Sequence, residues 1–105
     1  MAVMPIQKPG RSKQDYSTPP AFLDAVRKML RISDFSYDLA ASVENAVCPS
    51  FYDEAMDSLK QSWVVGGWAF CNPPYANIRP WVEKAVAEAA LGASIAMLLP
   101  ASVGS

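Results

Sequence analysis

The 105 residues include no histidine and only two cysteines, Cys48 and Cys71. With no histidine and no Cys-x-x-Cys spacing, the sequence offers no ligand set for a structural zinc ion, and a histidine general base is excluded. Both thiols are expected to be small buried hydrophobic groups rather than redox centres. We therefore expect a chemistry that needs neither a metal ion nor a reactive cysteine.

Long apolar runs are also missing from the sequence. No stretch reaches the roughly 18 apolar residues that a membrane helix needs, and the start, MAVMPIQKPGRSKQDY, lacks the apolar segment of a secretory signal. Hydrophobic residues make up 51% of the chain and charged residues 18%, a balance typical of globular proteins. These features predict a soluble, cytoplasmic protein of at most one domain.

The net charge of −1 gives no general attraction to nucleic acid. Its distribution is uneven, because residues 1–31 hold six Lys or Arg against two Asp. We expect residues 1–14 to form a flexible basic arm and residues 15–105 to form the folded part. The arm would either contact phosphates or remain a solvated tail.

Apolar spacing predicts two helices and three strands. Ser17 and Thr18, followed by two prolines, predict a helix start in which a hydroxyl is the cap. This helix should cover residues 19–31, where apolar residues recur at helical spacing. Asn77 is expected to cap a second helix, and Gly92 to end it. Strands are expected near residues 35–39, 64–70 and 94–100, and residues 43–62 are left open between a short helix and an irregular connection.

The segment from about residue 64 to residue 100 is a strand–helix–strand crossover, which implies parallel strands. Its last stretch, SIAMLLP, is almost wholly apolar, as expected for a strand covered on both faces. Ligands of parallel sheets bind beyond the carboxyl ends of the strands. Two predicted strand ends carry polar or special residues, at 38–41 and at 72–75, so we expect the site there.

The stretch FCNPPY, residues 70–75, follows a strand with an amide and two prolines. An aromatic amine such as adenine N6 is a poor nucleophile, because its lone pair is drawn into the ring. Two acceptors on its N–H groups would favour a tetrahedral nitrogen, and the Asn72 side-chain carbonyl and the Pro73 backbone carbonyl are candidates. The prolines would hold both acceptors rigidly, and Tyr75 would stack on a flat base. The alternative is a strand-ending turn with a capping asparagine.

Four stretches of the sequence resemble the phage-type DNA N-6-adenine methyltransferases. They are YSTPPAFLDAV, FSYDLAASVENAVCPSFYDEAMDSL, WAFCNPPYANIRPWVEKAV and GASIAMLLPA. NPPY alone is shared with other amino methyltransferases, whereas DLAASVEN together with the early TPP is more particular to this family. The resemblance implies an α/β, Rossmann-like S-adenosylmethionine-dependent methyltransferase fold, with a mostly parallel sheet and flanking helices. It also implies methyl transfer from S-adenosylmethionine to adenine in double-stranded DNA, without a metal, by a phage or prophage protein in a bacterial cell.

The resemblance further implies roles for individual residues. Those that would hold the target amine and its base are Asn72, Pro73, Pro74 and Tyr75. Those that would contact the methyl donor are Thr18, Pro19, Asp38, Ala40, Ala41 and Asp57. Three of these have simpler explanations: Asp38 as a turn residue, Thr18 as a helix cap and Asp57 as a solvated charge.

The sequence departs from the wider superfamily in lacking a Gly-x-Gly pattern after its first predicted strand, although the family itself tends to read D-x-A-A-S there. It also stops at LLPASVGS, where family members continue. We therefore expect an incomplete domain with an unpaired sheet edge and a partly uncovered core. Two other functions stay open: methylation of an RNA base amine or a protein glutamine, and a non-catalytic remnant that only binds the donor.

Overall fold

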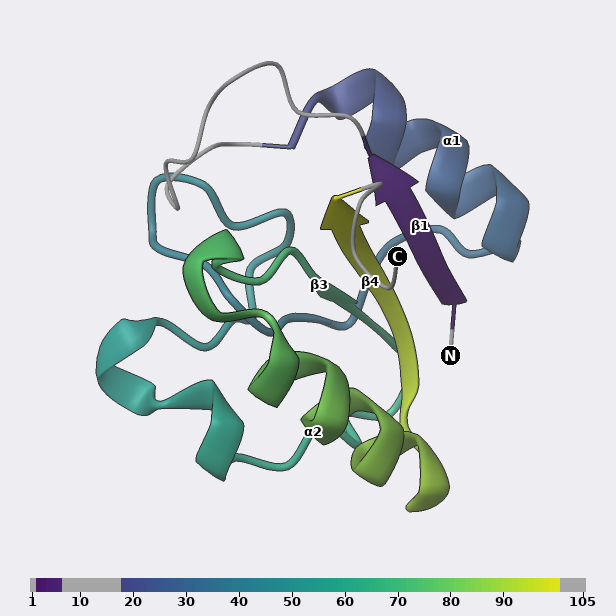
Figure 1. Cartoon of the computed structure of the whole chain (residues 1–105). Coiled ribbons are helices and arrows are strands. Elements are labelled where there is room, and N and C mark those ends of the chain that lie inside the picture. The colour runs from purple at the N-terminus through teal and green to yellow at the C-terminus, as the bar shows by residue number, and fades with distance from the viewer. Residues whose placement is uncertain (1, 7–17, 101–105) are drawn as a thin grey trace.

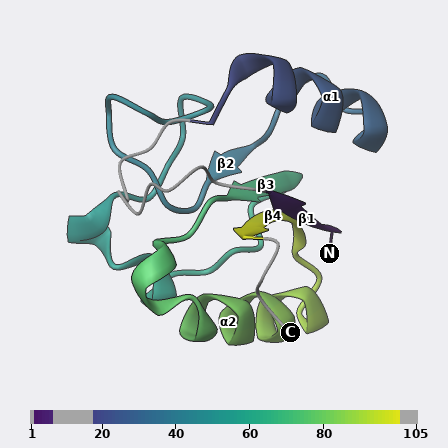
Figure 2. The same ribbon diagram turned by 45° about the horizontal axis from the view of Figure 1, so that its top comes forward.

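The computed structural model describes residues 2–6 and 18–100, which form a parallel sheet between two helices. The strands lie in the order β1-β4-β3-β2, and every neighbouring pair is parallel. Their bounds are β1 Ala2–Ile6, β2 Tyr37–Asp38, β3 Trp68–Cys71 and β4 Ser94–Pro100. The helices are α1 Pro20–Leu30 and α2 Arg79–Ala90, and they cover opposite faces of the sheet (Figures 1 and 2). The predicted α/β class and the parallel crossover through α2 are confirmed.

The first strand differs from the prediction. A flexible arm was expected over residues 1–14, but β1 pairs in parallel with β4 from Ala96 to Pro100. The prediction is therefore wrong for residues 2–6, while residues 7–14 lie outside the described residues. Pro5 weakens the strand pattern in the sequence, yet β1 is an edge strand, where proline is tolerated. Because β1 covers β4, the expectation of an unpaired edge does not hold for β4.

Both helices begin without the side-chain caps that the sequence suggested. The N-cap of α1 is Pro19, with no side-chain hydrogen bond, so Thr18 is not the cap, and Ser17 lies outside the described residues. The N-cap of α2 is Ile78, and Asn77 ends the short 3-10 helix η3 Tyr75–Asn77 instead. A proline in the first turn of each helix fixes φ and lacks an N–H group that would need a partner. The predicted end at Gly92 is confirmed by its φ of 107° and its N–H bond to Ala89.

The sheet separates two apolar cores. On the α2 side, Ala69 and Cys71 of β3 pack with the odd-numbered residues 95, 97 and 99 of β4. On the α1 side, Phe70 packs with residues 96 and 98 of β4 and with Leu23 and Val26 of α1. Successive residues of a strand point to opposite faces, so this division follows from the pleat. The prediction that SIAMLLP is covered on both faces is confirmed.

The connection between β2 and β3 holds little regular structure. It contains two 3-10 helices, η1 Glu54–Met56 and η2 Ser58–Lys60. The third strand is shorter than predicted, because the chain bends at Gly66, with φ of 82°, and β3 begins only at Trp68. Among the described residues, no helix is long and apolar enough to cross a bilayer.

Candidate functional site

A cavity of about 330 Å³ lies beyond the carboxyl ends of β2 and β3. Three parts of the chain line it: residues 39–42 after β2, Asn72 and Pro74 after β3, and residues 52–54 and 57–59 from the long connection. Asn45 and Trp81 complete the lining. This is the position at which parallel sheets bind ligands, and the volume falls at the lower end of the range of small-molecule sites.

The register of β2 against β3 explains why the two strand ends meet. Asp38 is paired with Phe70, and the Leu39 N–H group donates to the Phe70 carbonyl at 2.8 Å. Ala40 and Asn72, which each lie two residues beyond this pair, both line the cavity. The stretches that the sequence marked as candidate strand ends therefore form two neighbouring parts of one wall.

Asp38 organises the loop after β2. Its side chain is only 3% exposed, and its two carboxylate oxygens accept hydrogen bonds from the N–H groups of Ala40 (3.2 Å) and Val47 (3.1 Å). Burial raises the pKa of Asp38 from 3.8 to about 6, and the two hydrogen bonds oppose that rise only in part. The Asp38 backbone also pairs with residues 50 and 52, which holds the returning chain beside β2. Asp38 is thus a turn-forming residue, and it fixes the loop that lines the cavity.

Asn72 connects the NPPY stretch to the start of α1. Its side chain is half-buried, and its Nδ2 donates a hydrogen bond to Oγ1 of Thr18 at 3.3 Å. The two residues also line a second, much smaller pocket, together with Asp38 and Ala40. Ala40 and Asn72 line both spaces, so the small pocket lies next to the larger cavity.

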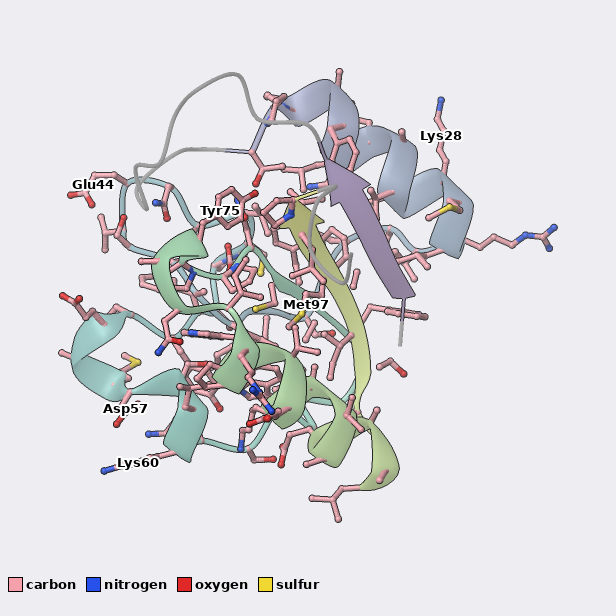
Figure 3. All side chains as sticks on the ribbon, in the orientation of Figure 1. Lys28, Glu44, Asp57, Lys60, Tyr75 and Met97 are labelled. Atoms are coloured by element: carbon pink, nitrogen blue, oxygen red, sulfur yellow. The ribbon has the colours of Figure 1, made fainter. Side chains whose placement is uncertain are left out.

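The part of the lining that comes from the connection between β2 and β3 is acidic. Asp53, Glu54 and Asp57 line the cavity there, whereas no Lys or Arg does so among the described residues. Asp57 joins η1 to η2 in the left-handed conformation, with φ of 53°, and its carboxylate lies 3.7 Å from Lys60 Nζ. Figure 3 shows both side chains on the outer side of the 3-10 helices. This wall favours a cationic ligand over a phosphate.

The acidic wall is attached to α2 through Trp63. The Trp63 side chain is fully buried, and its backbone N–H donates to Glu88 Oε1 at 2.6 Å. Its indole N–H lies 3.0 Å from the carbonyl and 3.1 Å from the hydroxyl of Ser58, a residue that lines the cavity. Glu88 also pairs with Lys84, whose Nζ lies 3.3 Å from Oε2. These contacts fix η2 relative to α2, and thereby the shape of the cavity.

The structure brings most of the predicted site residues together. The larger cavity is lined by five of them: Ala40, Ala41, Asp57, Asn72 and Pro74. Thr18 and Asp38 lie at the small pocket beside it. The other three line neither space: Pro19 is exposed, Pro73 is buried and Tyr75 is half-buried. Tyr75 nevertheless lies near the carboxyl ends of β3 and β4 (Figure 3).

Comparison with known proteins identifies the family of the chain. The sequence model of the DNA N-6-adenine-methyltransferase (Dam) family matches residues 7–105. The chain belongs to this family. A DNA N-6-adenine-methyltransferase of Escherichia phage T1 is 34% identical over 100 residues, which are 88% of this chain and 42% of that protein. The chain thus spans less than half the length of this relative. No solved structure matches it significantly.

Membership of the Dam family confirms the resemblance that the sequence suggested, but the cavity contains residues that the sequence analysis did not single out. Tyr52 and Trp81 supply aromatic surface, and Asn45 accepts a hydrogen bond from the Ser42 N–H group at 2.8 Å. All three residues lie inside stretches that resemble the family, which was the available signal. The position of Trp81 in the predicted second helix gave no sign of a place in the site.

Proposed function

We propose that this chain forms the donor and amine sites of an enzyme that transfers a methyl group from S-adenosylmethionine to N6 of adenine in DNA. Family membership supports this reaction, as does the name of the phage T1 relative. The observation that carries it is the shared wall, in which Asn72 lies beside the Ala40–Ala41 corner at the carboxyl edge of a parallel sheet. The proposal includes a Rossmann-like methyltransferase arrangement for the sheet.

The residues of the larger cavity fit the methyl donor. When bound, S-adenosylmethionine supplies an activated methyl group on a positively charged sulfur, so that the protein has chiefly to position the reactants. The backbone at Ala40 and Ala41 would lie along the donor, because small side chains there leave the loop open to a close approach. The carboxylates of Asp53 and Glu54 would attract its positive charge, and Asp57, whose side chain lies on the outer side of the 3-10 helices, would add to the negative potential only at longer range.

Asn72 is the residue that we assign to the target amine. Its side-chain oxygen would accept one N–H of adenine N6 and direct the nitrogen lone pair toward the donor. We assign the Pro73 carbonyl to the second N–H and the Tyr75 ring to the base face, on the resemblance to the family alone. The adenine must leave the duplex stack to reach this edge, which costs a few kcal/mol that contacts with DNA must offset.

Methyl transfer to duplex DNA with a radiolabelled donor tests the proposal, with RNA and protein offered as alternative acceptors. We expect label in DNA adenine, and we expect Asn72→Ala to remove it while donor affinity changes less than about twofold. The matched control is Asn77→Ala, since Asn77 is exposed in η3 and does not line either pocket. Label in protein or RNA but not in DNA would contradict the assignment. Equal losses in both variants would show that Asn72 has no special role.

A further inference from the structure

The hydrogen bond between Thr18 and Asn72 joins the segment just before α1 to the loop after β3, 54 residues later in the sequence. Thr18 is half-buried, and its hydroxyl does not cap α1, whose N-cap is Pro19 without a side-chain bond. The obvious structural role of the hydroxyl is therefore not used. Instead, the Thr18 hydroxyl accepts a hydrogen bond from Asn72, the residue that we assign to the target amine.

The orientation of the Asn72 amide decides what that group can do. An asparagine side chain carries donors on one terminal atom and an acceptor on the other, and rotation by half a turn exchanges them. Nδ2 donates to Thr18 in the structure, so the oxygen Oδ1 lies on the other branch of the planar amide, away from Thr18. The half-turned amide would present N–H groups to the target amine, and two donors facing each other do not bind.

We propose that Thr18 is a positioning residue that holds the Asn72 amide with its oxygen available to the target amine. This rests on the proposed function, and it changes the role that the sequence suggested for Thr18, which was contact with the methyl donor. The small pocket supports the change. It places Thr18 with Asn72 and Asp38, whereas Thr18 does not line the larger cavity that fits the donor.

A first experiment reads the amide directly, without any turnover. In the folded chain labelled with ¹⁵N, the Asn72 side-chain NH₂ signals are identified by their loss in Asn72→Asp. Thr18→Val keeps the shape of the side chain and removes the hydroxyl, and we expect it to shift these signals and to speed their solvent exchange by roughly threefold to tenfold. Thr18→Ser keeps the hydroxyl and should restore both. Unchanged Asn72 signals in Thr18→Val would overturn the proposal.

A second experiment separates positioning from donor contact. Calorimetry with S-adenosylmethionine should give affinities within about twofold for the wild type, Thr18→Val and Thr18→Ser. In the transfer assay, Thr18→Val should lower kcat roughly tenfold or more, as expected for a misplaced reacting group, with little change in KM for DNA. A tenfold loss of donor affinity in Thr18→Val would instead show that Thr18 binds the donor. If the wild type transfers no methyl group while the amide signals behave as expected, the proposed function fails and the Thr18–Asn72 contact stands.

Discussion

The buried carboxylate of Asp38 predicts an unusual dependence of stability on pH. Asp38 is 3% exposed, and no described Lys or Arg forms an ion pair with it. Burial therefore dominates, and it raises the pKa from 3.8 to about 6. Such a group binds its proton more tightly in the folded than in the unfolded chain. Its contribution to stability is present below about pH 4 and is lost as the pH rises through about 6.

The size of the effect follows from the difference in pKa. Each unit corresponds to about 1.36 kcal/mol, so the full effect on the free energy of unfolding is about 3 kcal/mol. Most of it, about 2.5 kcal/mol, falls between pH 4 and pH 7. Other carboxylates titrate near the lower end of this window, so the comparison must isolate Asp38. Asp38→Asn serves this purpose, because it keeps the shape of the side chain and does not titrate.

Urea unfolding can be followed through the fluorescence of buried Trp63 at constant ionic strength and several pH values. Asp38→Asn replaces one of two acceptors with a donor. The free energies of unfolding of the variant and the wild type are therefore expected to differ by about 1–3 kcal/mol at low pH. The informative quantity is how the difference between wild type and variant changes with pH. We expect the wild type to lose about 2.5 kcal/mol relative to the variant from pH 4 to pH 7. A constant difference would refute the raised pKa, and a gain by the wild type would mean that hydrogen bonds outweigh burial.

Three further predictions concern the acidic wall and the end of α2. Glu88→Ala leaves the Trp63 N–H and the Lys84 ammonium without their carboxylate, so it should lower the free energy of unfolding in urea by about 3–5 kcal/mol. Glu88→Gln keeps an acceptor and should lose clearly less. Asp57→Asn tolerates the same left-handed backbone but lacks the charge, so calorimetry should show weaker binding of S-adenosylmethionine with unchanged stability. Gly92→Ala should lower the thermal midpoint, because a φ of 107° strains any side chain by about 1–3 kcal/mol; an unchanged midpoint would contradict this.

The sequence predicted the elements of the fold better than their ends. The helix around residues 20–30 and the strand SIAMLLP are confirmed, because apolar spacing over a long segment reports burial directly. The caps were wrong, since proline in the first turn is enough to start both helices and leaves the nearby Thr18 and Asn77 for other positions. The strand at residues 2–6 was missed, because its pairing depends on the neighbouring strand β4 rather than on local sequence.

The candidate site could be predicted to a similar extent. Two polar strand ends at one edge of a parallel sheet follow from the order of the elements, and both line the cavity. Their register does not follow, because it depends on how Phe70 packs with Phe35 and on the pairing of Asp38 with Phe70. The 3-10 helices and the contacts of Trp63 lie in the segment whose structure the sequence left open. The acidic wall was represented in the prediction by Asp57 alone.

Two side chains at the candidate site depart from local preference, Asp38 at the small pocket and Asp57 at the larger cavity. Asp38 is a buried carboxylate that is held only by backbone N–H groups, and Asp57 adopts a left-handed backbone that few residues with side chains tolerate. Neither feature benefits the packing of the two cores. The cores would pack equally well with a neutral residue at 38 and a glycine at 57. Such departures from local preference are expected where a site imposes its own requirements. A double variant that relieves both should therefore gain stability at pH 7 and lose affinity for the donor, whereas a gain in both would separate these residues from the site.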